Sequence, residues 1–173
     1  MNRFAELLDR VAFEHSRNGK LRLLADYFRH SEDPDRGWAL AAMTGALSFR
    51  HAKPAVIRQL VAERTDPVLF DMSYDYVGDL SETVSLLWPA PAQRLGAGHN
   101  APPPPTLSEV VEILHETPKA ALPQALATLL DQLDETGRWA VLKLITGSLR
   151  IGVSARLAKT ALASLGDDVA PNA

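Results

Sequence analysis

The chain has 173 residues, of which 46% are hydrophobic, with a formal net charge of −3 and no cysteine. This length suits one domain with a substantial core. The lack of cysteine excludes disulfides and thiolate metal sites, and it fits a cytoplasmic protein. No apolar run approaches the roughly 18 residues that span a membrane, and Glu6 stands where a signal peptide would have its apolar region. We therefore expect no membrane partner.

Helical periodicity runs through the first half of the chain, and no alternating strand pattern interrupts it. Asn18–Gly19 is expected to separate the first two helices, whereas Asp33–Pro34 and Asp66–Pro67 each combine an N-cap with a proline of the first turn. Gly78 ends a helix and Asp79 caps the next. The expected helices cover roughly residues 4–16, 21–28, 34–47, 54–61, 67–77 and 80–88.

The segment 89–105 carries two glycines and four consecutive prolines. We interpret it as a long surface loop rather than a domain boundary, because neither half alone has a complete core. Helix restarts at the capping box Thr106–Glu109, and further helices follow from Leu122–Pro123, Thr136–Gly137 and Ser154. The pattern predicts an all-α fold over residues 1–173, a compact multi-helix domain of about ten short helices.

Residues 142–154 form the most informative segment, Leu-Lys-Leu-Ile-Thr-Gly-Ser-Leu-Arg-Ile-Gly-Val-Ser. Gly147 is expected to end one helix in the left-handed conformation, and Ser154 to cap the next. The turn between them carries Ser148, Arg150 and Gly152. Free backbone amides, small residues and a guanidinium then point outward together, which is the combination that a phosphate backbone requires.

Charge is unevenly distributed along the chain. The first thirty residues contain six cations against four carboxylates, and the stretch from about residue 63 to residue 135 is acidic. This distribution is the electrostatic footprint of a polyanion-binding surface, although ordinary solvated helix charge explains any single cluster as well. Residues 136–166 contain no Asp or Glu and five cations, Arg138, Lys143, Arg150, Arg156 and Lys159.

Two helix junctions, residues 16–20 and 146–150, share a glycine, a hydroxyl and a cation. The likeness is too short to establish a repeat, but it predicts that the domain grips a duplex by paired turns. Lys20 and Arg150 lie in or beside these turns and not on a periodic helix face. We interpret both as ligands of backbone phosphates.

Other candidate chemistry has a simpler structural explanation. Glu112 and His115 have the spacing of a di-iron motif but lack the second copy that such a site needs. Asp71, Asp75 and Asp79 are interpreted as a polar helix face, with Asp79 as a cap. The three tryptophans lie in apolar helical patterns, so we expect them in the core and not under stacked bases.

Three blocks resemble the N-terminal DNA-binding domain of bacterial ATP-dependent DNA ligases. Gly147–Ser154 is similar to the family's G-x-L-R-I/L-G-x-S/A signature, Val77–Leu87 to its G-D-L-x-E-T helix start, and Phe4–Leu8 with Lys20–Phe28 to its opening helix pair. The resemblance implies an all-helical domain that binds duplex or nicked DNA across the minor groove. The contacts would be mostly to sugar and phosphate and independent of base sequence.

The resemblance also implies a parent ligase of DNA repair, replication or recombination in the bacterial cytoplasm, associated with the nucleoid. No lysine here stands in the Lys-x-Asp-Gly motif that is adenylated during ligation, so we expect no catalytic residue and no cofactor in this chain. ATP and Mg²⁺ would belong to nucleotidyltransferase and OB-fold domains of the same polypeptide, with a linker beginning at about 167–173. The implied DNA-binding residues are Arg17, Lys20, Gly147, Ser148, Arg150, Gly152 and Ser154.

Two other interpretations stay open. The main alternative is a helical-repeat scaffold that binds protein through the acidic middle of the chain. The less favoured alternative is a complete small helical enzyme. Salt-dependent binding of DNA without sequence preference separates the first interpretation from both alternatives.

Overall fold

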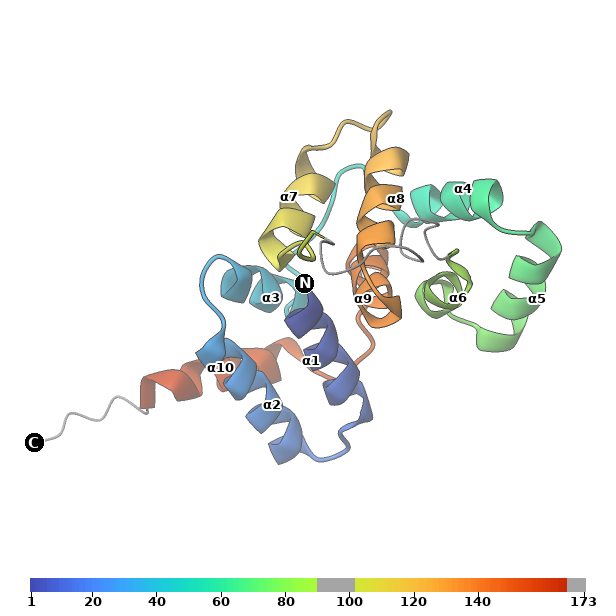
Figure 1. Ribbon diagram of the computed structural model, residues 1–173. Helices are drawn as coiled ribbons and strands as arrows, with labels where there is room; N and C mark the ends of the chain where they lie inside the picture. Colours follow the sequence, from blue (N-terminus) through green and yellow to red (C-terminus); the bar gives the residue numbers. More distant parts are fainter. Residues whose placement is uncertain (90–101, 168–173) are drawn as a thin grey trace, which may run out of the picture.

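The computed structural model describes residues 1–89 and 102–167, and within these ranges it contains ten α-helices and no strand (Figure 1). The all-α prediction is confirmed. Most of the predicted loop 89–105 and almost all of the predicted linker 167–173 lie outside the described residues. The helices are α1 (Asn2–Phe13), α2 (Arg17–His30), α3 (Asp35–Met43), α4 (Pro54–Arg64), α5 (Pro67–Val77), α6 (Leu80–Leu87), α7 (Leu107–Glu116), α8 (Leu122–Gln132), α9 (Glu135–Thr146) and α10 (Ala155–Asp167).

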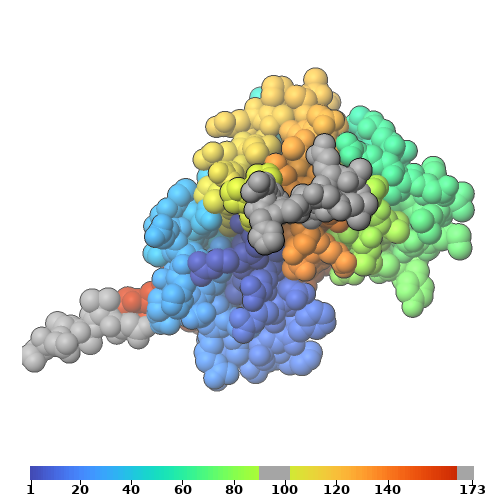
Figure 2. Space-filling model, in the orientation of Figure 1, coloured from blue at the N-terminus to red at the C-terminus, as the bar shows by residue number. Residues whose placement is uncertain are grey.

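Helix α9 occupies the centre of the fold. It packs against α1, α4, α6 and α8, and most of its side chains are buried. Helices α4, α5 and α6 form one end of the molecule, whereas α2, α3 and α10 lie at the other (Figures 1 and 2). Because apolar side chains from every helix join one buried cluster, the two ends are held together by a shared hydrophobic core.

Four of the predicted helix caps form, whereas the cap predicted at Asp33 does not: α3 begins at Asp35, and Pro34 before it makes no side-chain bond to the helix. Asp66 and Asp79 each accept a bond from the third residue of their helix at 2.9 Å. Thr106 and Glu109 form the complete capping box, and the Ser154 hydroxyl accepts the Leu157 N–H at 3.1 Å. These side chains satisfy amides that the first turn of a helix leaves without partners.

Gly19 and Gly137 lie inside helices. The sequence predicted that one helix begins after Gly19 and that another begins at Thr136–Gly137. Helix α2 begins at Arg17 with Ser16 as its cap, and Ser16 Oγ accepts the Gly19 N–H at 2.9 Å. Asp134 caps α9 in the same way, accepting the Gly137 N–H at 2.8 Å. A side chain at Gly19 would overlap those of Glu14 and Ser16. Glycine here permits a close approach to the cap, and it does not mark a turn.

The three tryptophans and His115 make contacts within the fold. Trp88 is buried with its indole N–H on Asp131, and Trp38 and Trp139 pack against the core. His115 Nε2 lies 3.0 Å from the Ser48 carbonyl and its ring lies beside Phe49. Within residues 1–89 and 102–167 no three metal-ligating side chains gather, and no helix has the length and apolarity to cross a membrane.

Candidate nucleic-acid interface

The turn between α9 and α10 has an unusual backbone. Gly147 ends α9 with a φ of 74°, and Gly152 has a φ of 67°. Arg150, between them, has a φ of 51° and is the one residue other than glycine with positive φ in the described part of the chain. A side chain in this region costs on the order of 1 kcal/mol. The guanidinium is therefore presented from a conformation that its surroundings must maintain.

Lys20 provides one such restraint from a distant part of the sequence. Its Nζ donates to the carbonyl oxygens of Ile151 at 3.2 Å and Gly152 at 3.1 Å. This contact is possible because α2 packs along α10 and brings its first turn to the α9–α10 turn. A Cβ at Gly152 would overlap the Lys20 ammonium group. Glycine at residue 152 thus avoids left-handed strain and leaves room for the Lys20 ammonium group at the turn.

A basic hollow of about 520 Å³ opens beside this contact, where α2 and α10 begin. Among the described residues, no carboxylate lines this basic hollow. It joins four of the sequence-predicted residues to two cations or potential cations, His15 and Arg156, that were not in the predicted set. The lining residues are His15, Arg17, Lys20, Gly152, Ser154, Arg156 and Leu157.

A second hollow of about 620 Å³ lies on the other side of the turn, between residues 147–155 and the end of α3 at 42–45. Thr44 and Gly45, which line this hollow, were not among the residues predicted from the sequence. The sequence did contain a signal for them, because residues 44–45 are the same Thr-Gly pair that ends α9 at residues 146–147. Gly45 has a φ of 75°, and the Thr44 hydroxyl donates back to the Leu40 carbonyl at 2.9 Å. Ser148 is exposed on the same turn but lines neither hollow.

The basic segment 136–166 is less exposed than its composition indicates. Arg138 is 8% exposed and its Nε donates to the Leu130 carbonyl at 2.8 Å. Lys143 is 3% exposed and pairs with Asp79 at 2.6 Å. Both lie on the buried side of α9, so they stabilise the fold. Of the five cations in the segment, only Arg150, Arg156 and Lys159 are exposed.

The Lys143–Asp79 pair anchors the base of the turn. Lys143 also provides the carbonyl that accepts the Gly147 N–H at 3.1 Å, while Asp79 caps α6. Burial alone would raise the pKa of Asp79. Hydrogen bonds from Lys143 and from the Glu82 N–H, with the charges of Lys143 and Arg150, outweigh burial and lower this pKa below its usual range. Two sequence blocks more than sixty residues apart therefore meet through one buried ion pair.

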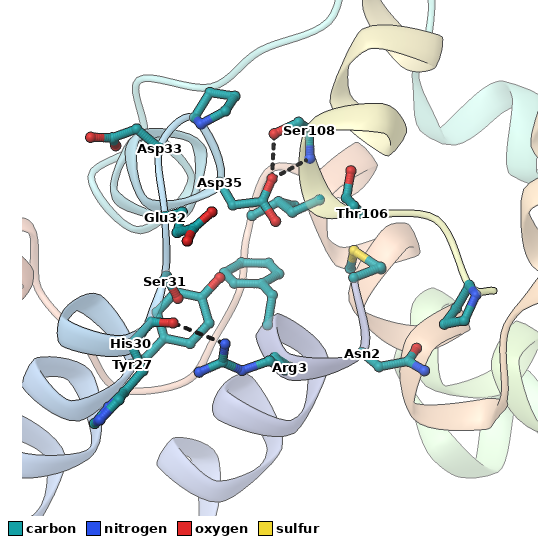
Figure 3. A pocket seen from close by; sticks show the side chains of 15 residues that line it. Asn2, Arg3, Tyr27, His30, Ser31, Glu32, Asp33, Asp35, Thr106 and Ser108 are labelled. Atoms are coloured by element: carbon teal, nitrogen blue, oxygen red, sulfur yellow. Dashed lines mark hydrogen bonds between the residues drawn. The ribbon is translucent and has the colours of Figure 1, made fainter.

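A third hollow, of about 610 Å³, has the opposite electrostatic character (Figure 3). Its lining includes Glu32, Asp33 and Asp35, and Asp35 accepts bonds from the amide and hydroxyl of Ser108. Arg3 points toward the His30 carbonyl and donates to it at 2.9 Å. Three carboxylates oppose the binding of a phosphate. Of these surfaces, the turn and the basic hollow are the ones suited to a polyanion.

One known protein family matches the part of the chain that contains the turn and both hollows beside it. Residues 1–163 match the family described as DNA ligase N terminus. The match includes α1 to α9, most of α10, and both hollows that flank the α9–α10 turn. A search of curated proteins found no match to the chain.

Proposed function

Because the chain belongs to the family of N-terminal domains of ATP-dependent DNA ligases, we propose that it binds duplex or nicked DNA without sequence preference. The contacts run along the sugar–phosphate backbone and the minor groove. Nick sealing must operate at any DNA sequence, so the domain recognises phosphate positions and groove shape and makes no sequence-specific contacts to base edges.

The observation that carries this proposal is the arrangement around the α9–α10 turn. Exposed Arg17 and Arg156 flank the basic hollow, and exposed Arg150 follows on the turn itself. Helices α2 and α10 both begin here, so their first-turn amides add partial positive charge. An extended anion such as a phosphate backbone is the ligand that this combination of groups favours.

The residues of the site divide into three roles in this proposal. The exposed arginines Arg17, Arg150 and Arg156 contact phosphates as cations, and the Ser148 hydroxyl adds an uncharged contact. Gly147, Gly152 and Ser154 let the backbone approach the sugar. Lys20 acts by positioning, since its ammonium group already donates to two carbonyls of the turn. This role differs from the direct phosphate contact that the sequence predicts for Lys20.

We further propose that the parent protein is a bacterial ligase of repair, replication or recombination, acting in the cytoplasm near the nucleoid. Its nucleotidyltransferase and OB-fold domains would bind ATP and Mg²⁺. Support comes from the family and from the lack of a Lys-x-Asp-Gly motif in this chain. DNA sealing then requires a lysine nucleophile from another part of the polypeptide.

Fluorescence anisotropy with labelled duplexes at a series of salt concentrations tests DNA binding. Three phosphate contacts, by Arg17, Arg150 and Arg156, correspond to a slope of log K against log salt of about −3 on B-DNA. Duplexes of unrelated sequence should bind equally. Lys119→Ala is the matched control, because Lys119 is exposed between α7 and α8 and the variant loses one charge far from the turn. Affinity that does not change with salt, or an equal loss in Lys119→Ala and Arg150→Ala, would contradict the proposal.

A further inference from the structure

Helix α5 exposes four large apolar side chains. Val68 is 67% exposed, Leu69 53%, Met72 68% and Tyr76 93%, while only Phe70 of this helix is buried. Single exposed apolar residues are normal on soluble proteins. Four on one eleven-residue helix form a continuous patch, and such patches mark interaction sites.

The four side chains lie on one face of α5. Residues 68, 72 and 76 are spaced by one helical turn, and residue 69 continues the same stripe. The opposite side holds α5 to the protein: Phe70 and Tyr74 stack at 5.9 Å, and Arg58 of α4 lies over the Tyr74 ring at 5.5 Å. The α5 stripe, residues 68, 69, 72 and 76, therefore faces away from the core.

Charge on α5 identifies the kind of partner. Asp71 and Asp75 are exposed along one edge of the stripe, Asp66 caps the helix, and α5 carries no lysine or arginine. Carboxylates beside the stripe repel a phosphate backbone and attract a basic group. The stripe also lies at the end of the molecule opposite α2 and α10 (Figures 1 and 2). A partner bound there would leave the proposed DNA surface free.

We propose that the α5 stripe docks an amphipathic helix of a partner protein, with an apolar face and a lysine- or arginine-rich edge. The apolar face covers the four exposed side chains, and the basic edge pairs with Asp71 and Asp75. A second copy of this chain fits less well, because pairing two α5 helices brings four such carboxylates together and α5 adds no cation. The stripe is only two turns long, so the complex belongs to the weak, transient class.

The test uses two fluorescein-labelled helical peptides of about 15 residues with the same leucine face. One peptide carries lysine along one edge, and the other carries glutamate at the same positions. We expect the basic peptide to bind the wild-type protein about tenfold more tightly, from two exposed charge pairs. The double variant Asp71→Asn/Asp75→Asn should bind the two peptides with nearly equal affinity.

Apolar variants test the stripe itself. Met72→Ser and Tyr76→Ser should each weaken binding of the basic peptide about fivefold or more, because each removes a large exposed side chain from the contact. Leu86→Ser is the control, since Leu86 is 58% exposed on α6 outside the stripe; this variant should keep wild-type affinity. All of these variants should keep the wild-type melting temperature and DNA affinity, so loss of DNA binding would be a separate failure.

Three results would overturn the inference. The first is equal affinity of the wild-type protein for both peptides, which includes binding of neither. The second is an unchanged affinity for the basic peptide in Met72→Ser and Tyr76→Ser. The third is a dimer of the peptide-free protein in sedimentation velocity that Tyr76→Ser dissociates, since a second copy would then occupy the stripe.

Discussion

Replacing Lys20 by methionine tests whether this residue positions the α9–α10 turn or binds DNA itself. The side chain keeps its length and apolar stem but loses both bonds to the Ile151 and Gly152 carbonyls, at 3.2 and 3.1 Å. Hydrogen bonds from a charged donor stabilise by more than neutral ones. These two are long and partly exposed, so about 1 kcal/mol each is a reasonable magnitude.

The expected effect on DNA binding follows from that magnitude. Without the two bonds, the turn loses the restraint that Lys20 places on it, and Arg150 can relax out of its strained conformation at φ 51°. A loss of about 2 kcal/mol in the binding-competent state of the turn weakens DNA affinity by up to about 30-fold. The fold itself should persist, because Lys20 lines the open basic hollow and is not one of the side chains of the buried core.

Salt dependence separates positioning from direct contact. If Lys20 only holds the turn, Lys20→Met weakens binding with an unchanged salt slope, because no phosphate contact is lost. If Lys20 binds a phosphate, the slope becomes shallower by about 0.9. Lys20→Arg adds a second criterion. Arginine serves a phosphate at least as well as lysine does, but its rigid planar fork does not reproduce the single ammonium group that donates to both carbonyls.

A double-mutant cycle with Gly152→Ala completes the test. Alanine at residue 152 adds left-handed strain, and its Cβ displaces the Lys20 ammonium group. In the Lys20→Met background only the strain remains, so the two changes should be less than additive by about 1 kcal/mol. A shallower slope in Lys20→Met, together with wild-type DNA affinity in Lys20→Arg, would refute the positioning role.

Four further predictions concern Arg150, the buried Asp79–Lys143 pair and the chemistry of the chain. Arg150→Ala should weaken binding on every duplex alike and reduce the salt slope by about 0.9 with little change in melting temperature; a large loss of stability would instead make Arg150 a structural residue. Asp79→Asn keeps an N-cap but leaves the buried Lys143 ammonium without its anion, so denaturant unfolding should show a loss of about 3–5 kcal/mol. Lys143→Met should lose clearly less, and equal losses would contradict the assignment. Because the pKa of Asp79 is lowered in the folded protein, its contribution to stability is present above the unfolded value of about 4 and disappears as pH falls through the lower folded value. Melting temperatures of the wild type should therefore fall more steeply through this pH window than those of Asp79→Asn, and parallel declines would refute the assignment. Incubation with labelled ATP and Mg²⁺ should leave no labelled band on denaturing electrophoresis, because no lysine here stands in Lys-x-Asp-Gly. A stable band would show that another residue of the chain acts as the nucleophile.

Local features of this protein were predictable from its sequence. The caps at Asp66, Asp79, Thr106 and Ser154, and the left-handed end of α9 at Gly147, were each predicted correctly. Such features depend on side chains within about four residues of the amides that they satisfy. The same local range explains why the signature turn could be selected as the candidate site from thirteen consecutive residues.

The roles of the cations were decided only by the tertiary structure. Lys143 looks like part of a basic surface in the sequence, but its partner Asp79 lies 64 residues away and packing of α6 on α9 buries both. Lys20 holds a turn more than 130 residues further along the chain. Thr44–Gly45 becomes part of the site only because α3 ends beside α10. The exposure and the partners of a charged side chain depend on which distant helices pack over it, whereas helical periodicity and caps depend on near neighbours.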